Sequence, residues 1–461
     1  MKFLWGAATS SHQIEGGNVH NDWWQWEAQG KIETGEISGA ATDHWNRFQE
    51  DLRWAADLGM NSYRFSVEWS RWEPEAGHWD EGAIDWYRAL VAECEKRGLL
   101  PMLTLYHFTL PRWLAERGGF AAPDAPDRFA LFVEKVASVL GPRVPLWCTL
   151  NEPMALVVGA YLGSFMPPSI VDPKLASLAT ANLFRAHVKA YDILHSRITE
   201  RKGPWKDHPI QVGIAHNMID FRPLREWHLG ERLTTEIFRR YYNRSWPDAL
   251  TGRRQHFGVR GLIPYVPQVK EALGRRTVDY LGINYYLKVY VRMQPYFDTP
   301  VTPQVNASVP NSSKLPIGIA FSKVGDTVSD LGWAVHPQGL GRMIRFMSRY
   351  GLPLYITENG IADDKDRLRP GYLVSHLKEI ASAVAAGSDV RGYFHWSLLD
   401  NFEWVKGFAP RFGLLEVDYR TFERKPRLSA ELYRRIIAEH RELADTRPQA
   451  QAIERAYSTF K

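Results

Sequence analysis

Eight short apolar runs alternate with longer amphipathic stretches along this chain, and that alternation restricts the fold more than any other feature. The runs span residues 3–8, 62–67, 101–106, 145–150, 210–215, 280–284, 353–357 and 392–396. Several are apolar at nearly every position, which is typical of parallel strands covered on both faces. Strands that alternate with helices predict βαβ units. Eight such units predict an α/β fold closed into a (β/α)8 TIM barrel, with its site at the carboxyl ends of the strands.

The intervals between the runs carry helical patterns, at residues 45–58, 83–97, 127–140, 176–201, 337–350, 370–386 and 428–440. Two connections are much longer than the rest. One runs from about residue 205 to residue 278, and the other, rich in Pro, Ser and Asn, runs from 288 to 331. Loops of this length in a compact domain are usually functional or disordered. No linker, repeat or low-complexity tract divides the chain, so we expect residues 1–461 to form a single barrel domain with long strand-end loops.

Composition and charge argue against several classes of function. The formal net charge of +5 is small for 461 residues. Basic residues form no run of about five or six, so nucleic acid is not an expected partner. No stretch of about 18 apolar residues could span a membrane, and the apolar start at 3–8 is too short for a secretory signal. We therefore expect a cytoplasmic protein with no membrane partner, and the sequence leaves open whether it forms a homo-oligomer.

Metal and redox chemistry find little support in the sequence. Cys94 and Cys148 are the only cysteines, cannot build a disulfide framework and have no neighbours at metal-ligand spacing. We interpret them as buried thiols. A metal-dependent barrel isomerase or hydrolase would need His and Asp clusters at ligand spacing, and none is apparent. We expect no metal and no cofactor.

Tryptophan is abundant, with 18 residues, and many lie beside polar neighbours, as in residues 21–26. A large aromatic core would account for some of them. A Trp that keeps one edge in water also suits stacking on a sugar ring, because the face of a pyranose is apolar and its rim is polar.

Two carboxylates follow two of the predicted strands and would lie at the mouth of the barrel. Glu152 stands in Asn151-Glu152-Pro153, and Glu358 stands in Glu358-Asn359-Gly360. Buried carboxylates are costly unless they are paired or used. Glycoside hydrolysis needs such a pair: one acid protonates the leaving oxygen, and the other group attacks the anomeric carbon or activates water. A separation of about 5–5.5 Å selects retention through a covalent intermediate.

The residues around both carboxylates resemble the two signatures of glycoside hydrolase family 1, the β-glucosidase family. These are Thr-Leu-Asn-Glu-Pro at 149–153 and Ile-Thr-Glu-Asn-Gly at 356–360. The resemblance continues, in the order of the family, at 3–16, 63–71, 284–286, 330–333, 393–404 and 411–414. It implies a single catalytic barrel that hydrolyses terminal non-reducing β-D-glucosyl residues, or galactosyl or fucosyl residues, of small-molecule glycosides.

The resemblance also implies roles for individual residues. Glu152 is the expected general acid/base and Glu358 the expected nucleophile. The first must hold its proton near neutral pH, and the second must stay ionised. Arg64, at the end of the second strand, and Tyr286 are expected to support the charged form of Glu358. The alternatives are a structural ion pair for Arg64 and a core phenol for Tyr286.

Sugar recognition needs hydrogen-bond donors and acceptors in clusters, with aromatic faces beside them. The residues that match hydroxyl-binding positions of the family are Gln13, His107, Asn151 and Glu403. Trp396 and Trp404 match its aromatic floor and rim, and Phe412 its wall. The remaining expected substrate contacts are Asn217, Asn284 and Trp333. His395 and Asp400 are expected to be structural.

Three positions discriminate between branches of the family. Glu403 indicates an unphosphorylated sugar, because a carboxylate there would repel a phosphate. Glu152 indicates ordinary O-glycosides, because the plant thioglucosidases carry Gln at that position. The usual Trp-Asp after His107 reads Phe108-Thr109 here, and Phe108 lacks the indole N–H that could bond a sugar hydroxyl. Galactose, fucose and mannose are therefore alternatives to glucose. A catalytically retired, sugar-binding barrel is the alternative from another class of function, and the two intact carboxylates argue against it.

Overall fold

The computed structural model describes residues 2–253, 257–259, 263–266, 270, 274–293, 317–442 and 447–460. Eight parallel strands form a closed barrel in the order β1-β13-β12-β9-β5-β4-β3-β2. They are β1 (Leu4–Ala8), β2 (Ser62–Ser66), β3 (Leu100–Tyr106), β4 (Leu146–Asn151), β5 (Gln211–Asn217), β9 (Tyr280–Asn284), β12 (Leu354–Asn359) and β13 (Val390–Trp396). All eight predicted strands are confirmed, and so is the (β/α)8 fold class.

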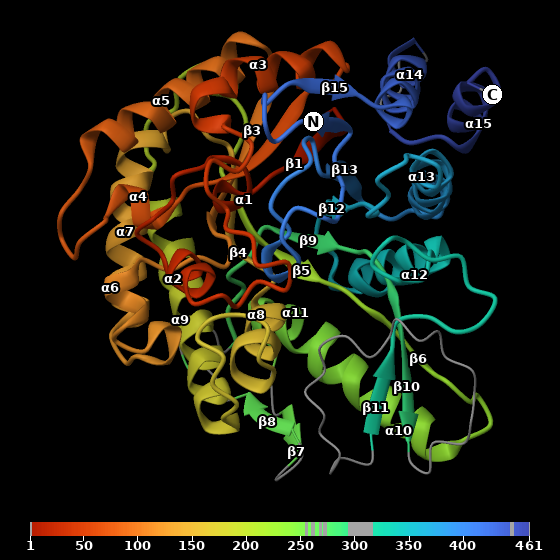
Figure 1. Ribbon diagram of the computed structural model, residues 1–461, viewed down its shortest axis with the longest axis horizontal. Coiled ribbons are helices and arrows are strands. Elements are labelled where there is room, and N and C mark those ends of the chain that lie inside the picture. The colour runs from red at the N-terminus through yellow and green to blue at the C-terminus, as the bar shows by residue number, and fades with distance from the viewer. Residues whose placement is uncertain are drawn as a thin grey trace.

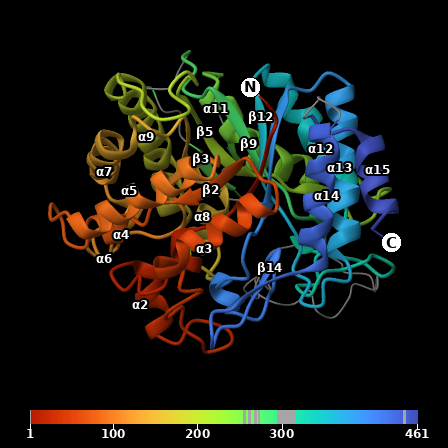
Figure 2. The same ribbon diagram turned by 90° about the horizontal axis from the view of Figure 1, so that it is seen from above.

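The predicted helices surround the barrel, as Figures 1 and 2 show. They are α3 (His44–Asp57), α5 (Glu81–Lys96), α7 (Ala125–Leu140), α9 (Pro173–Arg197), α12 (Pro337–Met347), α13 (Arg369–Ala385) and α14 (Leu428–Glu442). The helix predicted to reach residue 201 ends at Arg197. The one predicted to reach residue 350 ends at Met347 and continues as a 3-10 turn, η6 (Ser348–Tyr350). α9 begins where Asp172 accepts from the backbone N–H groups of Lys174 and Leu175, which is ordinary N-capping.

Short elements carry the strand-end loops on one side of the barrel. They are α1 (Ser11–Ile14), α2 (Asp22–Ala28), α4 (Trp69–Trp72), α6 (Arg112–Ala115), η1 (Gly119–Ala121), α8 (Pro153–Leu156), η2 (Val157–Leu162) and η7 (Trp404–Lys406). The chain closes with the hairpin β14 (Leu415–Val417) and β15 (Arg424–Pro426), followed by α14 and α15 (Ala450–Ser458).

The two long connections contain regular structure of their own, which the sequence patterns did not reveal. The first holds β6 (Asp220–Pro223), α10 (Leu229–Phe238), η3 (Arg239–Arg244), α11 (Ser245–Leu250), β7 (Phe257–Val259) and β8 (Ile263–Val266). The second holds β10 (Lys288–Met293) and β11 (Ile317–Ala320), which form a sheet with β6 in the order β11-β10-β6. This small sheet lies beside α10 and α12 in Figure 1. Residues 294–316 of the second connection lie outside the described residues.

The inside of the barrel is filled by side chains, so chemistry is confined to its open end. One apolar cluster includes Leu100, Leu146, Tyr280, Tyr355 and Phe394, which come from five different barrel strands. A far larger cluster packs the barrel strands against the surrounding helices. No helix in the described part of the chain is long and apolar enough to cross a membrane.

Candidate active site

Four neighbouring strands end at the predicted catalytic pair. Glu152 directly follows β4, and Glu358 is the penultimate residue of β12. β5 and β9 lie between these two strands in the barrel. Each of the intervening strands ends on an asparagine, Asn217 in β5 and Asn284 in β9. The two amides are therefore brought beside the carboxylates by strand order alone.

Glu152 is buried and is surrounded by neutral donors. Its Oε1 accepts from Asn284 Nδ2 at 2.8 Å and from Asn217 Nδ2 at 3.2 Å. Burial and the charge of Glu358 raise the pKa of Glu152 to about 8, although the two amides lower it in part. The side chain is therefore mostly protonated at neutral pH. Its backbone is left-handed, with φ 43° and ψ 56°, between the end of β4 and Pro153. Such strained conformations in non-glycine residues cluster at functional sites.

Glu358 is also buried, but both of its oxygens face strong donors. Arg64 Nη1 donates to Oε1 at 2.5 Å, and the Tyr286 hydroxyl donates to Oε2 at 2.6 Å. Arg64 is fully buried in β2 and also bonds Thr357 O, Asn151 Oδ1 and Thr104 Oγ1. Burial alone would lower the pKa of Arg64, but the charge and hydrogen bond of Glu358, together with neighbouring Cys148 and Tyr280, outweigh it and the pKa is raised. A permanently charged guanidinium and a phenol O–H therefore each donate to one oxygen of Glu358.

His107 is fixed as a neutral donor by its partners. Arg64 Nη2 donates to Asn151 Oδ1 at 2.8 Å, which identifies that atom as the amide oxygen. Asn151 Nδ2 therefore donates to His107 Nε2 at 3.1 Å, so the imidazole proton lies on Nδ1. Burial and the charge of Arg64 hold the pKa of His107 well below its usual value. Its Nδ1 is buried with no hydrogen-bond partner in the described residues, so this N–H is available to a ligand.

Gln13 and Glu403 form a second polar group at the mouth. Gln13 Nε2 donates to Asn401 Oδ1 and to the Phe402 carbonyl, both at 2.9 Å, and lies 3.4 Å from Glu403 Oε2. Desolvation, with the charges of Glu358 and Glu152, raises the pKa of Glu403 to about 8. Three acidic side chains therefore converge on one small space, and their mutual repulsion favours at least one bound proton.

The predicted aromatic residues lie around these polar groups. Trp396 and Trp404 stack on His107, with ring centroids 5.9 and 6.2 Å apart. Phe412 and Trp333 each contact Tyr286 edge-on, at 6.2 Å. Phe108, which stands where the family usually has Trp, is buried against Trp404, with ring centroids 5.5 Å apart. Its backbone is left-handed, with a φ of 71°. The structure thus brings all fourteen candidate residues to one end of the barrel.

Two positions that orient this site were missed by the sequence analysis. The Tyr242 hydroxyl donates to Asn217 Oδ1 at 2.9 Å, which turns the amide N–H₂ group toward Glu152. His12 pairs with Glu27 at 2.7 Å and stacks on Trp404 at 5.8 Å. Tyr242 lies in η3, within the first long connection, where no motif marks it. His12 is adjacent to Gln13, but its side chain gave no signal separate from the motif around it.

The described residues contain no group of three or more His, Cys, Asp or Glu side chains arranged to hold a metal ion. Both cysteines are buried as free thiols.

Several known proteins similar to this chain are named as β-glycosidases. A β-galactosidase of Pyrococcus woesei is 31% identical over 95% of this chain and 96% of its own length. β-Glucosidase A of Thermotoga maritima is 30% identical over 94% of this chain and 96% of its own. The solved structure of a β-glycosidase from Pyrococcus horikoshii is 37% identical, covers 99% of this chain and 97% of that one, and superimposes with a TM-score of 0.81. The sequence model of the family described as Glycosyl hydrolase family 1 matches residues 1–442. The chain therefore belongs to glycosyl hydrolase family 1 and is a glycoside hydrolase.

Proposed function

We propose that this enzyme is a retaining β-glycosidase that releases terminal non-reducing β-D-glucosyl residues, or galactosyl or fucosyl residues, from small glycosides. The observation that carries the proposal is the contrast between two buried carboxylates. Glu152 is bonded by neutral amides and has its pKa raised to about 8. Glu358 is bonded by a guanidinium and a phenol. One group is prepared to donate a proton and the other to attack as an anion.

The first step forms a bond between a carboxylate oxygen of Glu358 and the anomeric carbon. The glycosidic C–O bond breaks, and Glu152 transfers its proton to the departing oxygen, so that the aglycone leaves as an alcohol. Esterification removes the negative charge of Glu358. Because that charge helps to raise the pKa of Glu152, the pKa of Glu152 falls once the ester has formed.

The second step uses the deprotonated Glu152 as a base. It takes a proton from a water molecule, whose oxygen attacks the anomeric carbon and displaces the carboxylate of Glu358. The sugar leaves with its original anomeric configuration after two inversions. Both residues return to their starting protonation states, and no cofactor is consumed.

Within this proposal, Gln13, His107, Asn151 and Glu403 bind sugar hydroxyls, and the aromatic residues around them hold the apolar face of the ring. Asn217, Asn284 and Trp333 serve the side of the leaving group or orient Glu152. We place the enzyme in the cytoplasm, as one catalytic domain, and the two free, buried thiols fit a reducing compartment. The named relatives include both a β-galactosidase and a β-glucosidase, so the choice of glycone is left to experiment.

The test is a set of initial rates on 4-nitrophenyl β-D-glucoside, galactoside, fucoside, mannoside and 6-phosphoglucoside, with EDTA present throughout. Turnover of at least one unphosphorylated β-glycoside is expected, and ¹H NMR of the first released sugar should show the β anomer. Release of the α anomer would overturn the retaining mechanism. Turnover of the phosphorylated sugar alone would overturn the assignment of Glu403, and silence on every glycoside would favour a retired sugar-binding barrel.

A further inference from the structure

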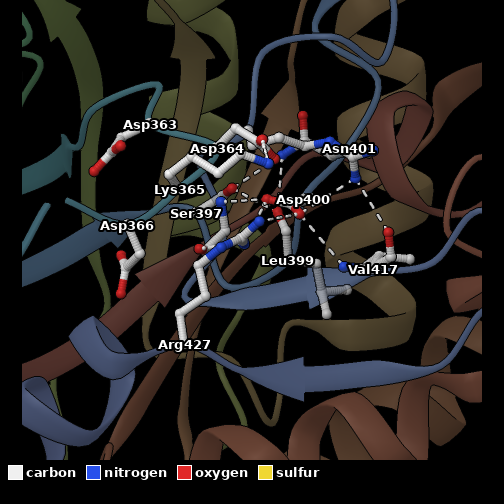
Figure 3. Close-up of polar contacts among 12 residues, drawn as sticks. Asp363, Asp364, Lys365, Asp366, Ser397, Leu399, Asp400, Asn401, Val417 and Arg427 are labelled. Carbon is white, nitrogen blue, oxygen red and sulfur yellow. Dashed lines mark hydrogen bonds and ion pairs between the residues drawn. The ribbon is translucent and has the colours of Figure 1, made fainter. Parts of the chain in front are cut away.

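A buried polar cluster outside the catalytic pair is centred on Asp400, in the loop that follows β13. Asp400 is fully buried, and Arg427, just before α14, is nearly so. The two side chains pair at two points, Arg427 Nη1 to Asp400 Oδ1 at 2.9 Å and Arg427 Nη2 to Asp400 Oδ2 at 2.8 Å. Figure 3 shows Asp400 at the centre of these contacts, with the side chain of Arg427 reaching it from below.

One branch of this hub leads to Phe412. The Gly413 N–H donates to Asp400 Oδ1 at 2.9 Å, and Arg427 Nη1 donates to the Gly413 carbonyl at 2.9 Å. A Cβ at Gly413 would lie 2.2 Å from the Asp400 backbone nitrogen, so the two segments can approach this closely only with glycine there. The ion pair therefore holds both backbone polar groups of Gly413, the residue that follows Phe412.

The other branch leads to Glu403. The Asp400 N–H donates to the Leu415 carbonyl at 3.0 Å, which fixes the backbone from which Asn401 projects. Asn401 Oδ1 accepts from Gln13 Nε2 at 2.9 Å, and the same nitrogen lies 3.4 Å from Glu403 Oε2. The path from Asp400 to a candidate sugar contact is thus a continuous series of hydrogen bonds and one covalent step.

We propose that the Asp400–Arg427 ion pair is a positioning element of the sugar site, which holds Glu403 and Phe412 at the spacing that a glycone requires. The inference rests on the proposed function. A buried ion pair adds little net stability compared with an apolar pair of the same shape, because both charges must be desolvated. The ion pair instead fixes the relative positions of chain segments. Asp400 also accepts from Val417 N at 3.4 Å and from Arg411 Nη1 at 3.3 Å, so one carboxylate holds three segments of chain.

The molecule contains a matched control for this role. Asp51 and Arg424 form a second two-point ion pair, at 2.7 and 3.0 Å, with both side chains fully buried. It joins α3 to β15, and His44 is its other side-chain partner. None of the candidate sugar contacts bonds to Asp51 or Arg424 in the described part of the chain. Loss of this pair should therefore report on the cost of breaking a buried ion pair without moving the site.

The experiment compares Asp400→Asn with Asp51→Asn in the full-length enzyme. The measurements are Tm, kcat and KM on the aryl glycosides that the wild type hydrolyses, and the Kd of a monosaccharide-like inhibitor. Both variants should lose stability. Asp400→Asn should also lower kcat/KM about 100-fold, mainly through KM, because a shift of about 1 Å in a positioning group has an effect of that size. Asp51→Asn should change kcat/KM by no more than about twofold, since distant sites rarely couple.

The relative rates on different glycones give a second readout, which a purely structural role would not move. Asp400→Asn should alter the ratio of kcat/KM between glucoside and fucoside, and Asp51→Asn should leave it unchanged. If Asp400→Asn does not fold, the double variant Asp400→Asn/Arg427→Gln removes both charges, so that no buried charge is left without its partner. The same kinetic outcome is expected for it.

An Asp400→Asn or double variant with wild-type KM and glycone ratio would overturn the positioning role, because the ion pair would then serve stability alone. This result is distinguishable from failure of the proposed function. In that second case the wild type itself would turn over none of the glycosides, whatever residue stands at position 400.

Discussion

Glu152 and Glu358 have chemically identical side chains but very different hydrogen-bond partners. At the end of β4, Glu152 receives neutral amide donors on Oε1 from β5 and β9. In β12, Glu358 receives a guanidinium on one oxygen and a phenol on the other. The difference is one of charge. Neutral amides donate hydrogen bonds to a carboxyl group but bring no opposite charge, whereas the guanidinium of Arg64 compensates negative charge directly.

The order of the strands brings different donors to the two carboxylates. Arg64 lies in β2 and bonds Glu358 in β12, whereas β5 and β9, which lie between β4 and β12, supply the asparagines that bond Glu152. Glu358 and Glu152 also act on each other, since the charge of the first raises the pKa of the second.

Removal of Glu358 should have the largest effect on catalysis. Glu358→Ala is expected to lower kcat roughly 10⁵-fold, because no group then forms the covalent intermediate. Added azide should restore cleavage of activated glycosides and yield the α-glycosyl azide, since the small anion enters from the face that the carboxylate occupied. The product is identified by ¹H NMR. A β-glycosyl azide would contradict the assignment of Glu358 as the nucleophile.

Removal of Glu152 should have a smaller effect on catalysis, and its size should depend on the substrate. Glu152→Ala is expected to lower kcat/KM about 10²–10⁴-fold for glycosides with poorly acidic leaving groups, because they need protonation as they depart. A 2,4-dinitrophenyl glycoside needs no such help, so its first step should be nearly unaffected. The measurement is a plot of rate against the pKa of the leaving group. Equal losses of kcat/KM for all leaving groups would contradict the assignment of Glu152 as the general acid.

The phenol beside Glu358 can be tested separately from the guanidinium. Tyr286→Phe deletes the hydrogen bond to Oε2 and leaves the ring contacts with Phe412 and Trp333 in place. A hydrogen bond to a charged group is worth about 1.5–3 kcal/mol, so kcat should fall about 10- to 100-fold. Tm serves as the control and should change little. A wild-type kcat would show that Arg64 alone suffices to prepare Glu358.

The smallest expected effect is a displacement of the pH profile. A general acid works only while protonated, so kcat/KM should decline as pH rises through the pKa of Glu152, about 8. Glu358→Gln removes the neighbouring charge that raises this pKa. The pKa of Glu152 in that variant should therefore move down toward its ordinary value, as followed by ¹³C NMR of labelled glutamate.

Glu403 is the control for that profile, because burial and its acidic neighbours raise its pKa to about 8 as well. Glu403→Gln should weaken sugar binding and leave the alkaline limb of kcat/KM in place. If the alkaline limb disappeared in Glu403→Gln, the limb would belong to Glu403 and the contrast between Glu152 and Glu358 would lose its kinetic support.

Much of the barrel could be predicted because each strand has a recognisable pattern in its own local sequence. The runs that became β1, β3 and β9 are apolar at nearly every position and are bounded by turns or helical patterns, so period and length are enough to identify them. The regular structure within 205–278 was not predicted. In the three-stranded sheet β11-β10-β6, β6 ends at residue 223 and pairs with β10, which begins at residue 288. Pairing between segments so far apart in the chain cannot be seen in a local pattern.

The candidate site divides in the same way. Motifs placed Glu152 and Glu358 at strand ends, and the family resemblance supplied the surrounding set. Neither could indicate that Tyr242 turns the amide of Asn217, or that Arg64 fixes the tautomer of His107 through Asn151. Asp400 is expected from the sequence to be structural, and nothing in the residues beside it points to its pairing with Arg427. Each of these relations depends on which atoms meet across the barrel.

The sequence by itself determined the number of strands, their order along the chain and the two carboxylates at strand ends, because hydrophobic period and motif spacing are properties of neighbouring residues. The tertiary structure decided which carboxylate meets Arg64, which meets amides, and how the rim that carries Glu403 and Phe412 is held. Those outcomes depend on burial and on distances between charges from remote segments, and both exist only once the barrel has closed.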